Sequence, residues 1–310
     1  MRAFLPLAIL LLFPLGNSCD LAGQELEPRN LTNLPRGLNF VSAGYLYTSG
    51  NTLLDPSLPL EDFNGRINIL TAAYIRSVNF WGKSGKIGVI LPFAGGDFEG
   101  RFDGDPFADT YTGLGDIRLR AAVNLTGAPS LTLREFADYQ QKTITGFGLQ
   151  ITAPTGNYRP EQLPNLGTNR WTFRLNYGIS HTVKKWIFEL YAGVWFFTPN
   201  NEFLEDFRQT QLPLWVAKSS IVRTIGRAGW IAFSAGYGYG ARVSIDGAQR
   251  DIVISQLRLS LVYAHQIASS HTVKLVVGSG IRFEQGGDFD AFGIVYQYSW
   301  LDKKSRPKTP

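Results

Sequence analysis

The chain has 310 residues, of which 44% are hydrophobic, 13% aromatic and 18% charged, with 33 glycines and a formal net charge of +5. So many apolar residues exclude a wholly disordered chain, and the positive charge is too diffuse for a nucleic-acid-binding protein. The one cysteine, Cys19, excludes an intrachain disulfide and a cysteine-ligated metal cluster. We expect no cofactor and no metal.

The first residues are typical of an exported protein. Met1 and Arg2 precede an apolar stretch over residues 3–15 and then small residues, which predicts a secretory signal peptide over residues 1–22. A periplasmic segment at residues 23–37 would follow. Cys19 as a lipidated first residue is the less favoured alternative, because Gly16 stands where lipoprotein signals usually carry leucine. No later run of 18 apolar residues exists, which excludes a helical membrane protein.

From residue 38 onward, hydropathy alternates with a period of two. Ile117, Leu119 and Val123 share one parity, while Arg118 and Arg120 share the other. Similar alternation recurs in the segments 66–76, 86–93, 170–179, 256–263 and 273–282. This pattern predicts β-strands with two unlike faces. Twelve strands are predicted, beginning near Leu38, Gly65, Gly85, Gly115, Thr143, Arg170, Trp186, Leu212, Trp230, Ile252, Thr272 and Phe289.

The connections between these strands alternate in length. Long segments rich in Gly, Pro, Asp and Asn follow the first, third, fifth and seventh strands, at residues 48–64, 94–114, 155–169 and 199–211. Most others are short. The exception is 126–142, within which residues 131–139 are compatible with a helical turn. We therefore predict an all-β fold: an antiparallel transmembrane β-barrel of about 12 strands over residues 38–300, with long extracellular loops and short periplasmic turns. A basic tail at 301–310 ends the chain.

Three features favour a membrane barrel over an exported soluble β-protein. The apolar face of most predicted strands carries no charged residue. Aromatic residues such as Trp171 and Trp186 gather near strand ends, where they suit the membrane interfaces. The last strand ends in Tyr296, Tyr298 and Trp300, like the ending that the barrel-assembly machinery recognises. We expect a bacterial outer-membrane location, with lipid and that machinery as partners.

The polar parity of the strands supplies the candidate functional residues. Ten basic and two acidic residues are predicted to face the lumen: Arg66, Arg76, Lys86, Asp116, Arg118, Arg120, Arg170, Arg174, Glu189, Arg258, Lys274 and Arg282. Such a surplus would attract anions. In the alternative interpretation, the arginines form a structural network with Asp116, Glu189 or loop carboxylates. The segment 27–36 could also enter the barrel and plug it.

Catalytic chemistry has little support. The histidines His181, His265 and His271 fall at predicted periplasmic turns, and no spacing suggests a nucleophile and its base. The alternating glycines 236, 238 and 240 lack the following helix of a nucleotide site and suit a curved strand. Acidic residues at 97, 99, 103 and 105 make calcium conceivable, but their spacing matches no known calcium loop and favours a solvated loop.

Several short motifs are shared with a known family. They are Glu27-Pro28-Arg29, Gly37-Leu38-Asn39-Phe40, Asp55-Pro56-Ser57-Leu58-Pro59, Trp81-Gly82-Lys83-Ser84, Gly113-Leu114-Gly115-Asp116, Asn124-Leu125-Thr126-Gly127-Ala128-Pro129, Pro154-Thr155-Gly156-Asn157-Tyr158 and Asn165-Leu166-Gly167-Thr168-Asn169-Arg170-Trp171. Over nearly its whole mature length, the chain resembles the outer-membrane transporter-like family named for a MetA pathway of phenol degradation. The resemblance implies uptake of aromatic or hydrophobic compounds and no catalytic residues. The basic tail at 303–308 departs from the usual aromatic end.

The prediction from sequence is thus an outer-membrane channel or facilitator for passive transport of small molecules. A non-conducting structural barrel and an outer-membrane hydrolase are the alternatives. Twelve strands lie between filled eight-stranded barrels and open sixteen-stranded porins, so a narrow lumen is expected.

Overall fold

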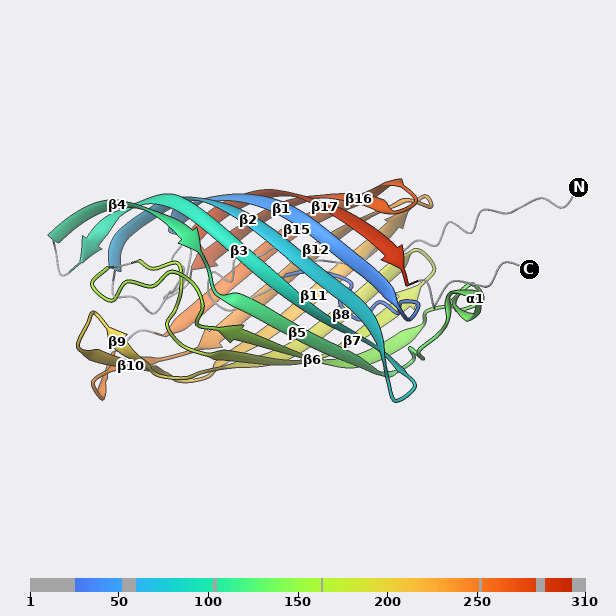
Figure 1. Cartoon of the computed structure of the whole chain (residues 1–310), viewed down its shortest axis with the longest axis horizontal. Coiled ribbons are helices and arrows are strands. Elements are labelled where there is room, and N and C mark those ends of the chain that lie inside the picture. Colours follow the sequence, from blue (N-terminus) through green and yellow to red (C-terminus); the bar gives the residue numbers. More distant parts are fainter. Residues whose placement is uncertain are drawn as a thin grey trace, which may run out of the picture.

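The computed structural model describes residues 26–51, 60–102, 105–162, 164–250, 253–282 and 288–302. Twelve antiparallel strands close into a barrel, because each pairs with its neighbours and β1 pairs with β17 (Figure 1). The barrel strands are β1 (Leu38–Asn51), β2 (Leu60–Phe80), β3 (Lys83–Phe102), β5 (Ile117–Thr126), β6 (Thr143–Ala153), β7 (Thr172–Val183), β8 (Trp186–Phe197), β11 (Leu214–Ile225), β12 (Gly229–Gly240), β15 (Ile254–Ala268), β16 (His271–Arg282) and β17 (Asp288–Leu301).

The predicted fold class is confirmed, and most strand starts agree with prediction to within two residues. β2 is the exception, since it begins at Leu60 rather than near Gly65. The predicted tenth strand start, Ile252, lies outside the described residues, as do the predicted signal peptide, Cys19 and the tail from residue 303. Closure satisfies the backbone hydrogen bonds of every barrel strand within the sheet, as a lipid environment requires.

The end of the barrel that carries the long connections contains more β-structure than expected. The stretch 94–114 is not an irregular loop: β3 continues to Phe102, and β4 (Asp105–Leu114) returns beside it. Apolar packing explains the extension, because Ala94 and Phe98 are buried in a cluster with residues of β1 and β2. A small second sheet of β9 (Asn200–Phe203), β10 (Phe207–Gln211), β13 (Val243–Ile245) and β14 (Ala248–Gln249) lies at this same end (Figure 1).

The opposite end carries the short turns and one helical turn. The predicted helical turn is confirmed as α1 (Leu133–Phe136), within the connection between β5 and β6. Thr132 caps it, and the Glu135 side chain accepts hydrogen bonds from the backbone and hydroxyl of Thr132. These bonds lower the pKa of Glu135. No helix in the described part of the chain is long and apolar enough to cross a membrane.

The outward-facing side chains form an apolar band with aromatic margins. Exposed large hydrophobic residues occur on every barrel strand. Near the short-turn end, Tyr298 stacks on Trp300 with ring centroids 5.7 Å apart, and Trp186 stacks on Phe188 at 6.5 Å. Near the long-loop end, Trp171 stacks on Phe173 at 6.4 Å. Two aromatic girdles around an apolar band are characteristic of a barrel in a bilayer.

The predicted facing of β2 is wrong. Ile67, Ile69 and Ile75 are buried on the lumen side, so Arg66 and Arg76 share the outward parity. Ten residues of strand separate the two arginines, about 33 Å along the strand. With the usual tilt of a barrel strand, that distance corresponds to an apolar band about 25 Å tall, so both charges lie at its margins. Arg76 forms an ion pair with Asp302 at the short-turn end.

Candidate functional site

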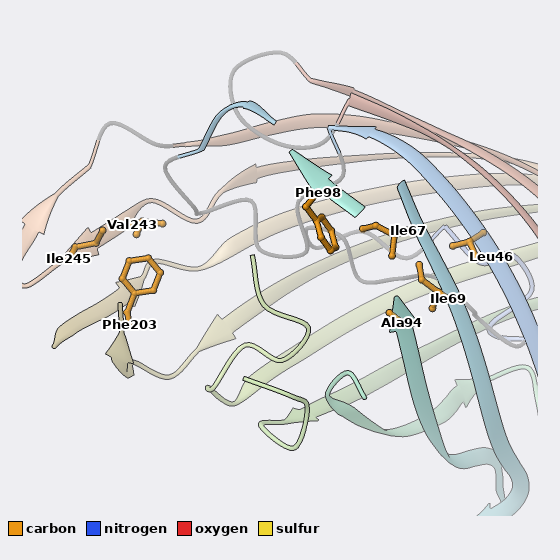
Figure 2. Close-up of a cluster of buried hydrophobic side chains, with 8 residues drawn as sticks. All are labelled: Leu46, Ile67, Ile69, Ala94, Phe98, Phe203, Val243 and Ile245. Carbon is orange, nitrogen blue, oxygen red and sulfur yellow. The ribbon is translucent and has the colours of Figure 1, made fainter. Parts of the chain in front are cut away.

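The lumen has an apolar wall, formed by the inward-facing side chains of β1, β2 and β3. Its members are Phe40, Leu46, Ile67, Ile69, Ala73, Ile75, Ile90, Ala94 and Phe98. Figure 2 shows five of them, together with Phe203 of β9 and Val243 and Ile245 of β13 at the long-loop end. Lys86, near the short-turn end of β3, is the charged residue on this side.

The basic wall lies on the other strands. We use this name for the inward-facing Arg118 and Arg120 of β5, Arg174 of β7, Lys218 of β11, Arg258 of β15 and Lys274 of β16. Of the predicted lumen residues, the structure buries Lys86, Asp116, Arg118, Arg170, Glu189, Arg258 and Lys274, and it half-buries Arg120 and Arg174. The Arg282 side chain lies outside the described residues.

Several of the arginines lie against aromatic rings. The guanidinium carbon of Arg170 is 4.8 Å from the centre of the Phe197 ring, and that of Arg174 is 5.3 Å from the Trp195 ring. Cation–π contacts of this kind strengthen when they are shielded from water. Arg170 and Arg174 therefore present both positive charge and aromatic surface in the long-loop half of the lumen.

Asp116 anchors the connection between β6 and β7. Its carboxylate accepts backbone hydrogen bonds from Thr155 at 3.1 Å, Gly156 at 2.9 Å and Thr168 at 2.9 Å, and one from the Thr168 hydroxyl at 2.7 Å. The backbones meet closely here, because a Cβ on Gly156 would lie 2.9 Å from the Cα of Gly167. Three of the shared motifs thus converge on one carboxylate, which holds the connection in place.

The N-terminal segment 26–37, which we call the plug, lies inside the barrel. This agrees with the alternative in which residues 27–36 enter the barrel and plug it. The backbone amide of Arg29 donates to Oε2 of Glu189 at 2.6 Å, while Lys86 Nζ donates to the carbonyl oxygen of Asn30 at 2.7 Å. Asn124 donates to the carbonyl of Leu31 at 3.2 Å. These partners stand on β8, β3 and β5, so the plug joins widely separated parts of the wall.

Apolar contacts and a side-chain hydrogen bond fix the plug near the short-turn end. Leu31 is buried with Ala128, Ile144 and Tyr191, while Leu34 is buried with residues of β1 and β2. The Asn33 side chain donates to the carbonyl of Pro129 at 3.2 Å. Burying two leucine side chains stabilises this position by about 3–6 kcal/mol. The plug is thus bound on all sides.

Sequence reasoning missed two lumen residues. Lys218 is buried on β11 and lies 4.3 Å above the Tyr191 ring, and Arg29 of the plug lies 5.7 Å from the Trp230 ring. The inward parity of β11 mixes Val216 and Val222 with Lys218 and Ser220, and the outward parity carries Arg223, so its hydropathy does not separate a polar from an apolar face. The feature of the sequence that could have identified this lumen residue is a lysine in the middle of a largely apolar strand.

The histidines lie where the sequence predicts, at the short-turn end. Their rings contact hydroxyl groups: His181 that of Thr143 at 2.8 Å, His265 that of Tyr263 at 3.3 Å, and His271 that of Tyr296 at 2.5 Å. Glycines 236, 238 and 240 belong to β12. In the parts of the chain that the structure describes, no group of three or more His, Cys, Asp or Glu residues could hold a metal ion.

Comparisons with known proteins agree with this architecture. Residues 47–284 match the model of the family described as "Putative MetA-pathway of phenol degradation". The chain belongs to this family. An outer membrane channel from Pseudomonas putida F1 has a similar structure, with a TM-score of 0.73 at 20% identity over 89% of this chain and 100% of that one.

Two autotransporter barrels are more distant in structure. The β-domain of BrkA from Bordetella has a TM-score of 0.52 at 13% identity, over 86% of this chain and all of that one. The transport unit of AIDA-I from Escherichia coli has a TM-score of 0.50 at 10% identity, over 87% and 93%. No protein with a curated description matches the sequence. The closed barrel, its apolar band and its girdles place this family member in the bacterial outer membrane.

Proposed function

We propose that the protein is a passive outer-membrane channel for small molecules, with the plug closing its lumen in the structure described. One observation carries this proposal: the lumen is wide enough to hold a stretch of the protein's own backbone. Residues 29–31 of the plug contact Lys86, Asn124 and Glu189, which stand on three different strands. A small barrel that served only as a scaffold would fill its interior with wall side chains.

The two walls suggest the chemistry of the solute. A molecule in this lumen would contact the apolar wall on one side and the basic wall on the other. This supports small solutes with an apolar or aromatic body, as the family's description suggests, and it allows a negative group on the same molecule. The three histidines lie at the short-turn end, against the hydroxyl groups of Thr143, Tyr263 and Tyr296 and away from the long connections, so we propose transport rather than hydrolysis.

Liposome swelling tests the proposal. Full-length protein and a variant lacking residues 26–34 are reconstituted, and solute entry is followed with benzoate and with benzyl alcohol as a neutral comparison. We expect measurable entry through the full-length protein and at least tenfold faster entry through the shortened one. A shortened variant that assembles as a heat-modifiable barrel and admits neither solute would contradict the proposal.

The extent of the plug contacts favours one second candidate, a non-conducting structural barrel. In that case, removal of residues 26–34 would open a pore, yet full-length protein would stay closed to every solute tested. Solute entry measured for the full-length protein and for the variant lacking residues 26–34 therefore distinguishes a channel from a structural barrel.

A further inference from the structure

Glu27 is held by cations from three different strands, two at its carboxylate and one at its backbone carbonyl. Its Oε1 lies 3.6 Å from Lys274 Nζ of β16, and its Oε2 lies 3.9 Å from a terminal guanidinium nitrogen of Arg120 on β5. Lys218 of β11 donates a hydrogen bond to the backbone carbonyl of the same residue. The side chains of Lys274 and Glu27 are only 2% and 8% exposed.

Such an arrangement requires an anion. Buried cations are costly unless a negative group neutralises them, and removing the negative partner leaves the charge uncompensated. No two of these three cations lie on adjacent strands. The plug brings them together, because it places the Glu27 carboxylate between Arg120 and Lys274 and the Glu27 backbone carbonyl against Lys218.

Space for a solute exists next to this position. A cavity of about 70 Å³ is lined by Asn30, Lys86, Arg120, Arg174 and Asn176, among others. A second cavity of about 40 Å³ borders Asn30, Arg174 and Lys218. Neither Asp nor Glu lines either cavity. Both flank the plug, so withdrawal of the plug would join them to the place of Glu27.

We propose that Arg120, Lys218 and Lys274 form a binding site for a small carboxylate, and that Glu27 occupies this site as a tethered surrogate while the lumen is closed. A carboxylate solute and the plug then compete for the same cations. The identification of this ligand as a transported solute rests on the proposed channel function; the binding itself does not.

A binding measurement on the whole mature protein tests the site. Trifluoroacetate serves as the probe, and ¹⁹F NMR line broadening in detergent micelles reports its affinity. We expect Glu27→Gln to bind the probe at least tenfold more tightly than the unmodified protein, because the substitution removes the competing charge and retains the size of the side chain. Glu202→Gln is the matched control, since Glu202 lies outside the barrel strands and its carboxylate accepts from Asn169.

Substitution of the cations gives the second half of the test. In the Glu27→Gln background, Lys274→Gln should lower the affinity at least tenfold, and Lys274→Arg should restore most of it. Arg66→Gln, on the outward face of β2, should change it less than twofold. Heat-modifiable migration confirms that each variant is folded. Equal affinity for Glu27→Gln and the unmodified protein, or unchanged affinity in Lys274→Gln, would overturn the site.

Failure of the site and failure of the channel are distinguishable. If the shortened variant admits benzoate while Glu27→Gln gains no affinity for trifluoroacetate, the channel stands and the carboxylate site is refuted. If Glu27→Gln binds trifluoroacetate and the shortened variant admits no solute, the site stands and the channel is refuted.

Discussion

β2 and β5 have the same alternating pattern, yet they face opposite ways. On β5, the apolar Leu119 lies outward at 47% exposure and Arg118 is buried in the lumen. On β2, the apolar Ile69 is buried in the lumen and Leu70 lies outward at 54% exposure. Alternating hydropathy therefore identifies the two faces of a strand. Where the lumen has an apolar wall, it does not tell which of the two faces contacts lipid.

The neighbouring strands decide the difference. β2 packs inward against Leu46, Ala94 and Phe98, so the lumen at β2 is an apolar environment. β5 faces a lumen of arginine, glutamine and the plug, in which Arg120 donates to Gln150 at 2.7 Å. A molecule in the lumen would therefore have the apolar wall on one side and the basic wall on the other.

The largest expected effect comes from reversing polarity on β5. Leu119→Arg places a charge in the apolar band at a cost of about 2–4 kcal/mol, whereas Arg120→Leu changes only the lumen. We expect a severe loss of folded, heat-modifiable protein for the first variant and near-normal yield for the second. Equal yields would mean that the facing of β5 is reversed.

A matched pair on β2 tests the corrected facing. Ile69→Ala opens a cavity in the packed apolar wall and should destabilise the barrel by about 2–4 kcal/mol. Leu70→Ala only makes a lipid-facing side chain smaller, so its loss of stability should be less than half that of Ile69→Ala. Urea titration of both variants in detergent gives the comparison. The sequence pattern alone predicts the opposite order.

The anchor at Asp116 predicts a comparable but more local effect. Asp116→Ala removes four hydrogen bonds to the connection between β6 and β7 and leaves buried backbone donors without this acceptor. We expect a loss of about 1.5–3 kcal/mol. The loss should appear as faster proteolysis within residues 155–168 in a barrel that stays folded. Unchanged cleavage there would show that Asp116 does not hold this connection.

Weakening a hydrogen bond between the plug and the barrel wall tests whether that bond keeps the lumen closed. Glu189→Gln replaces the charged acceptor of the Arg29 amide with a neutral one, at a cost of about 1–2 kcal/mol. The population with a displaced plug should rise, so solute entry should increase about fivefold or more. Glu202→Gln is again the control. The same entry rate in both variants would show that this bond does not limit plug release.

Sequence and structure agree where one physical rule acts alone. Period-two hydropathy predicts eleven of the twelve strand starts to within two residues, and the stretch 131–139, compatible with a helical turn, contains α1. The site was harder, because facing depends on what lies across the lumen. Arg66 and Arg76 were assigned inward since nothing local reveals the apolar wall. Lys218 is hard to find because both faces of its strand mix apolar and polar residues, and the partners of Glu27 are distant in sequence.

The smallest and most informative effect concerns ion selectivity. The basic wall contributes Arg118, Arg120 and Arg258, and charges in a narrow, partly desolvated passage are weakly screened. A lumen from which the plug has been removed should therefore favour anions, and reversal potentials under a salt gradient measure the preference. Replacing Arg118 and Arg120 together by Gln should lower the anion preference by a modest factor, about two.

The outward Arg66 and Arg76 supply the contrast for this measurement. Together they carry the same charge as Arg118 and Arg120. They lie at the margins of the outer face, where solvent ions screen them. Replacing both by Gln should leave the reversal potential unchanged. If this outer pair shifts selectivity as much as the inner pair does, the charge of the whole protein controls permeation and the basic wall does not. A cation-selective lumen would also contradict control of permeation by the basic wall. In that case, carboxylates closer to the permeating ion would outweigh the positive charges of the wall.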